Sequence, residues 1–105
     1  MNAHDFVTAW RQEKDSLLVA FTGSDSTSLV AEQIRALHLS DVQIQQLTTV
    51  IDELLTDAFY TLLLGLDGSA SIGGVQQTYR IFGEDGKLIS TAGEIEAEAY
   101  EAFHG

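Results

Sequence analysis

One apolar stripe constrains the fold of this chain more than any other feature. Apolar side chains recur at three- and four-residue steps over residues 44–62, at Ile44, Leu47, Ile51, Leu54, Ala58 and Leu62. At 100° per residue these positions share one face of an α-helix, in a band wide enough to face a core. A capping box precedes them, because Gln43 follows Ser40 by three residues. The sequence therefore predicts a long helix whose stripe packs into the core.

Three further helices are expected. Apolar residues recur at helical spacing over residues 3–21 and, in a shorter stretch, over residues 30–37. The break at residues 22–28 is rich in Ser, Thr and Asp, whose side chains accept the free N–H groups at a helix start. Residues 94–103 alternate Glu with Ile, Ala and Phe, which places the apolar side chains on one face. We therefore expect three N-terminal helices and a short C-terminal helix.

The region between the third and last helices is expected to form a β-hairpin. Residues 78–82 and 88–90 read as two short strands, and an Asp-Gly turn lies between them at residues 85–86. With three helices before this hairpin and one after it, the predicted fold class is α+β.

Residues 59–74 are harder to assign. Nearly every side chain in residues 59–66 is apolar, so periodicity does not distinguish a helix from a strand here. We favour the interpretation that the segment is the end of the third helix and is buried on all sides. Residues 65–74 contain four glycines and are expected to form an irregular loop that lets two elements approach closely. The loop is no phosphate-binding loop, because Gly74 and Val75 stand where the lysine and the hydroxyl residue are required.

Length and composition favour one globular domain over residues 1–105. Although the net charge is −11, 45% of the residues are apolar, which is enough to build a core. The chain has no cysteine, which excludes disulfides and thiolate chemistry, and its N-terminal residues lack the features of a signal peptide. The cytoplasm is the expected compartment.

The charge limits the classes of partner. Sixteen Asp and Glu residues face five Lys and Arg residues, and such a surface is repelled by phosphate backbones and anionic lipids. We therefore expect no nucleic-acid partner and no membrane partner. A basic protein is the partner class that this charge favours.

No catalytic, cofactor or metal motif is found. Ser69 and Ser71 lack the glycine spacing of a nucleophile elbow, and no histidine can be placed beside them. The carboxylates follow no calcium-loop or zinc-site spacing, although Glu84 and Asp85 could bind calcium weakly and without function. The sequence predicts no enzyme, no cofactor and no metal site.

Two groups of residues are candidates for a protein interface. Glu53, Asp57 and Tyr60 follow one another on the outer face of the third helix. A tyrosine anchors a partner at low entropic cost, and carboxylates around it accept hydrogen bonds from Arg or Lys. The second group is an acidic ridge on the last helix, formed by Glu94, Glu98 and Glu101. For both groups the alternative interpretation is a solvated surface that only confers solubility.

The segment Leu55-Thr56-Asp57-Ala58-Phe59-Tyr60-Thr61-Leu62-Leu63-Leu64-Gly65-Leu66-Asp67-Gly68, continued by Ser69-Ala70-Ser71-Ile72-Gly73-Gly74, resembles small acidic bacterial proteins, some of which look like antitoxin or immunity proteins. The resemblance covers residues 55–74 only. It implies a bacterial interaction protein, and it assigns no catalytic residue.

Three hypotheses of function follow. The first is a non-enzymatic, acidic protein-binding domain that masks a basic partner, as an immunity or inhibitor protein would. The second is a small structural or regulatory homodimer that uses the apolar end of the third helix and the hairpin edge, with no charged partner. The third is a small enzyme in which the glycine loop walls a substrate pocket.

Overall fold

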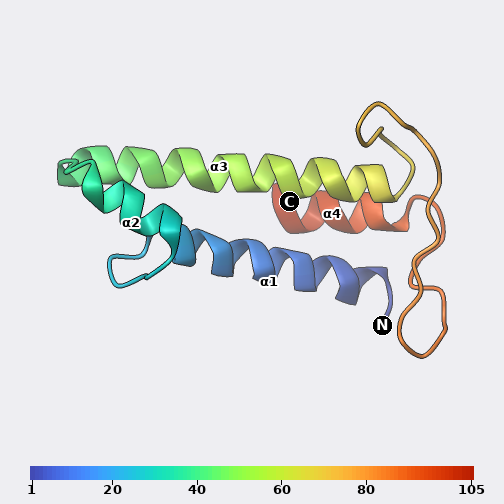
Figure 1. Ribbon diagram of the computed structural model, residues 1–105. Helices are drawn as coiled ribbons and strands as arrows, with labels where there is room; N and C mark the ends of the chain where they lie inside the picture. The colour runs from blue at the N-terminus through green and yellow to red at the C-terminus, as the bar shows by residue number, and fades with distance from the viewer.

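The computed structural model describes residues 1–105 as four α-helices without a β-sheet (Figure 1). The helices are α1 (Ala3–Thr22), α2 (Leu29–Ala36), α3 (Asp41–Leu66) and α4 (Glu94–His104). The four helices expected from the sequence are present, and residues 59–66 are helical because they belong to α3. No helix is both long enough and apolar enough to cross a membrane.

Side-chain caps begin the first three helices. Asn2 caps α1, Ser28 caps α2 and Ser40 caps α3, each by accepting a backbone N–H of the first turn. The capping box expected at α3 is formed in both directions: Ser40 Oγ accepts from Gln43 N at 3.2 Å, and Gln43 Oε1 accepts from Ser40 N at 2.9 Å. Local sequence therefore sets where these helices begin.

The predicted hairpin is wrong, and with it the α+β fold class. Residues 67–93 form an irregular connection whose only ladder contacts are two isolated bridges, one of them between Phe82 and Leu88. The expected turn exists, since Gly86 has a φ of 79°. A two-stranded ribbon needs further strands or a covered apolar face for stability, and here Phe82 and Leu88 stay 55% and 44% exposed while Ile89 is buried. The protein is all-helical.

The glycine-rich loop itself packs closely against the end of α3. A Cβ added to Gly65 would lie 2.3 Å from Ile72 Cγ1, far inside van der Waals contact. Glycine at this position therefore lets the loop fold back onto the end of α3.

The helices form an antiparallel pair with a third helix across one half of it. α1 and α3 run in opposite directions and are joined by α2, and α4 packs against both of them beside the C-terminal half of α3 (Figure 1). The core lies where α4 meets the pair and consists of Ala3, Val7, Leu63, Ile95, Ala99 and Phe103. The first and last helices therefore share one core.

The stripe that was expected to face the core is largely uncovered. Ile44, Leu54 and Leu62 are 38%, 59% and 43% exposed, whereas Leu55 and Leu63 are buried. Apolar side chains cover more of the circumference of α3 than the predicted stripe alone. The face that α1 and α4 cover is turned about 100° from the stripe, because each buried leucine follows a stripe residue by one position. The end of α3 was expected to be buried on all sides, but Leu62 is left exposed, while Leu63 and Gly65 are buried.

The molecule is elongated, with extents of 47 × 29 × 25 Å. Its radius of gyration is 16.3 Å, against about 13 Å for a compact chain of this length. Only 12 of the 105 residues are buried. One end of the molecule is therefore a packed three-helix unit, and the other end, formed by α2 and the adjoining halves of α1 and α3, is thin and open.

Candidate functional site

The structure places Glu53, Asp57 and Tyr60 on one flank of α3, beside α4. The Tyr60 ring is half-buried and packs edge-on against the His104 ring of α4, with 4.5 Å between the ring centroids. Glu53 and Asp57 are exposed and, with Asp52, Thr56 and His104, line a hollow of about 330 Å³. The α3 candidates thus remain together and gain a neighbour from α4.

A second hollow lies on the other side of Tyr60. It has a volume of about 420 Å³, and Tyr60, Glu96, Tyr100 and Glu101 are among its lining residues. Because Tyr60 lines this hollow and touches His104 of the first, the two hollows form one surface. We call this surface the acidic face; it consists of Glu53, Asp57, Tyr60, Glu96, Tyr100, Glu101 and His104.

The acidic ridge predicted on the last helix is divided by the packing of α4. Glu101 joins the acidic face. Glu98 faces α1 instead and pairs with His4, whose Nδ1 lies 2.8 Å from Glu98 Oε2. Glu94 lies at the start of α4, where it accepts a hydrogen bond from Thr91 Oγ1. The three glutamates therefore do not form one ridge, although Glu98 and Glu101 still line a common hollow beside α1.

The contact with Glu98 changes the titration of His4. The hydrogen bond to Glu98, followed by the Coulomb attraction of the same carboxylate, raises the pKa of His4 above its ordinary value. Protonated His4 thus links α1 to α4 outside the acidic face.

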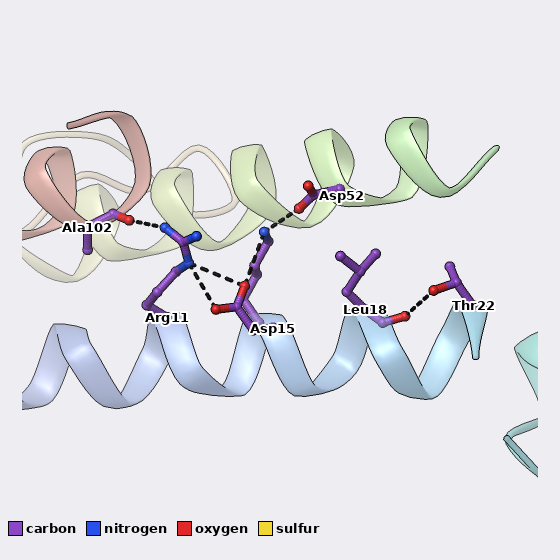
Figure 2. Close-up of polar contacts among 7 residues, drawn as sticks. Arg11, Asp15, Leu18, Thr22, Asp52 and Ala102 are labelled. Carbon is purple, nitrogen blue, oxygen red and sulfur yellow. Dashed lines mark hydrogen bonds and ion pairs between the residues drawn. The ribbon is translucent and has the colours of Figure 1, made fainter. Parts of the chain in front are cut away.

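Cations are absent from the acidic face because the nearby ones are used elsewhere. Lys14 of α1 is 4% exposed, and its amine pairs with Asp52 of α3 and, at 3.5 Å, with Asp15. Arg11 donates to the backbone carbonyl of Ala102 in α4 and pairs with Asp15 at 3.2 Å (Figure 2). No Lys or Arg lines either hollow. Of the four carboxylates of the acidic face, only Glu101 also lines a hollow with a strong cation, Arg11 of α1.

Asp67, which the sequence did not single out, fixes the position of α4. This buried carboxylate accepts from the backbone N–H of Gly93 at 3.0 Å and of Glu96 at 3.3 Å. Gly93 has no side chain with which to cap the helix, so Asp67 caps α4 from the end of α3. Ser69 donates to Glu96 Oε2 at 2.8 Å and holds that carboxylate at the edge of the acidic face.

Sequence reasoning missed Glu96, Tyr100 and His104. These residues follow one another at four-residue steps on α4, so helical spacing alone would have grouped them. Their relation to Tyr60 was not visible, because it depends on how α4 packs against α3.

The residues of the acidic face are suited to binding cationic groups. Carboxylates accept paired hydrogen bonds from guanidinium or ammonium groups, and two tyrosine rings supply flat apolar area beside them. The hydroxyl of Ser69 is bonded to Glu96 and Asp67, with no histidine in contact. No group of three or more His, Cys, Asp or Glu side chains is placed to hold a metal ion.

No family model, curated protein or solved structure matches this chain.

Proposed function

We propose that this protein is a non-enzymatic protein-binding domain whose acidic face receives a basic partner. The observation that carries the proposal is the meeting of Tyr60 and Tyr100 with four carboxylates at the junction of α3 and α4, where no Lys or Arg lines the surface. A solvated surface does not require two aromatic residues at its centre.

The two residue types have different roles in binding. Complementary charge accelerates the encounter, and the net charge of −11 acts over a distance of about 10 Å at moderate salt. Once the partner is in contact, the tyrosine rings supply rigid apolar area, and the carboxylates hold Arg or Lys side chains. Such a face would mask a basic surface of the partner, as in an immunity or inhibitor protein.

The compartment is part of the same proposal. The chain has no cysteine, and no helix is suited to cross a membrane. A cytoplasmic location, where a basic toxin or enzyme would be neutralised, is consistent with both features.

Charge reversal on the acidic face tests the proposed function. The double variant Glu53→Lys with Asp57→Lys should release a basic protein that the immobilised wild-type protein captures from a lysate of its source. The matched control is Asp25→Lys with Glu84→Lys, which makes the same change of net charge at exposed positions outside the helices. We expect at least a tenfold weaker affinity for the first variant and less than a threefold change for the control.

The control distinguishes binding at the acidic face from a general effect of the net charge. If both variants lost the partner equally, general acidity would explain capture, and the acidic face would be excluded as the site.

A further inference from the structure

The N-terminal half of α3 carries an apolar stripe that the rest of the chain covers only in part. It comprises Ile44, Leu47, Val50, Ile51 and Leu54, which we call the uncovered stripe. Val50 and Leu54 are 56% and 59% exposed, and Leu47 and Ile51 are only half-buried. A helix normally turns such a stripe towards a core, so its exposure indicates that something outside this chain covers it.

The neighbouring elements enlarge this apolar area. Leu29 and Leu37, at the two ends of α2, are 69% and 62% exposed, and Val42 in the first turn of α3 is 63% exposed. They belong to the thin end of the molecule, where α2 joins α1 to α3 (Figure 1). The apolar surface is therefore concentrated where the fold has no third layer.

The excess surface has the size of a subunit interface. The accessible surface of the chain is 6898 Å², whereas a folded monomer of 11.4 kDa is expected to expose about 5,800 Å². The excess is about 1,100 Å² per chain and is shared by the thin end and the exposed connection 67–93. Two chains that covered all of it would bury about 2,200 Å², which is an upper limit for the interface and exceeds the standard size of about 1,600 Å².

The charge distribution along the stripe favours a second copy over a basic partner. Residues 42–51 contain no Asp, Glu, Lys or Arg, and the adjoining Asp52 is paired with Lys14. A basic partner would find little attraction along these uncharged turns. Two copies that met along them would bring few like charges together.

We propose that the uncovered stripe is the interface of a homodimer in which α3 of one copy packs against α3 of a second copy. A two-fold axis would bring the stripe onto itself, since the same patch serves both copies. α1 and α3 of each copy would then form a four-helix arrangement around a shared apolar seam. The stripe borders the acidic face on α3, because Asp57 lies about 20° from Val50 around the helix axis, whereas Ile44 and Ile51 lie about 100° or more to the other side of Val50.

A pair of valines gives a matched test. Val50 in the stripe and Val75 in the connection are 56% and 57% exposed, so both tolerate lysine in the isolated chain. In the dimer, Val50→Lys would bring two like charges into the apolar seam, whereas Val75→Lys would bring none. We expect the wild-type protein and Val75→Lys to have twice the chain mass of 11.4 kDa in sedimentation equilibrium. Val50→Lys should sediment as a single chain with unchanged helical circular dichroism.

Protein concentration and salt complete the experiment. Val50→Lys should raise the dimer dissociation constant about 100-fold or more, because each copy contributes a charge to the seam. The wild-type dimer should persist at about 0.5 M salt, where the repulsion between the copies is screened. A wild-type protein that stays a single chain at about 100 μM in this salt would overturn the proposal and leave the stripe to another apolar partner. The proposal would also be overturned if the Val50→Lys protein formed a dimer as readily as the Val75→Lys protein.

Discussion

Two cations of α1 join helices and leave the surface acids unbalanced. Lys14 is buried beside Asp52 of α3, and Arg11 reaches the end of α4, where it donates to the carbonyl of Ala102 (Figure 2). A cation at a helix C-terminus also complements the helix dipole. The net charge of the chain therefore appears at the surface as carboxylates without cationic neighbours.

The pair of Lys14 and Asp52 can be tested against the adjacent residue. Replacing Asp52 with Asn leaves the buried amine without its ionised partner on α3, and we expect the free energy of unfolding to fall by about 1–3 kcal/mol. Glu53→Gln removes the same charge one position further on and should change stability by less than about 0.5 kcal/mol. Urea unfolding measures both. Equal effects would show that the pair contributes no more than a surface carboxylate does.

His4 predicts a pH dependence. Because Glu98 raises the pKa of His4 in the folded state, the contact stabilises the fold fully below the unfolded-state pKa of 6.5 and loses this contribution as the pH rises through the folded-state pKa. In Glu98→Gln the pKa of His4 should fall towards 6.5, which an NMR titration of the imidazole measures directly. An unchanged pKa would mean that the pair does not form in solution.

Among the elements, α4 depends most on a distant residue. Asp67→Ala removes the carboxylate that accepts from the N–H groups of Gly93 and Glu96, both in a partly buried region. We expect a loss of about 1–3 kcal/mol of stability and faster amide exchange in the first turn of α4. Glu84→Ala is the control, because it removes an exposed carboxylate from the same connection. If the amide groups in the first turn of α4 exchanged no faster in Asp67→Ala than in the control variant, Asp67 would not be the cap of α4.

The elements that the sequence predicts correctly are those set by local contacts. Ser40 and Gln43 begin α3 through bonds three residues apart, and such spacing can be read directly. The two predicted strands did not form, although the turn at Gly86 did. A strand needs a partner strand and a covered face, and no local sequence pattern guarantees either. The cap of α4 by Asp67 spans more than twenty residues and leaves no local signal.

The candidate site follows the same division. Helical spacing grouped Glu53, Asp57 and Tyr60, and the structure keeps them together on α3. Glu98 was grouped with Glu101 by the same spacing, but α4 packs so that Glu98 faces α1. A helical pattern identifies which residues share a stripe, whereas the packing of neighbouring helices decides which surface that stripe joins.

Over the whole molecule, the acidic face and the uncovered stripe lie along neighbouring stretches of α3 and meet at Glu53 and Leu54. The acidic face extends onto α4, and the stripe extends towards α2 at the thin end. Salt should act on the two surfaces in opposite directions, because it weakens attraction to a basic partner and screens repulsion between identical acidic chains. One chain could therefore pair with itself and still present its acidic face.

The shared core of the first and last helices has a consequence for how the chain folds. Ala3 and Val7 pack against Ile95, Ala99 and Phe103, so the core joins segments about ninety residues apart. Contacts this distant in sequence form slowly, because a long loop must close first. During synthesis, α1 and α3 would leave the ribosome before α4, with their core-facing apolar side chains exposed. Until α4 is synthesised, these side chains would be covered only by chaperones or by contacts between the early helices.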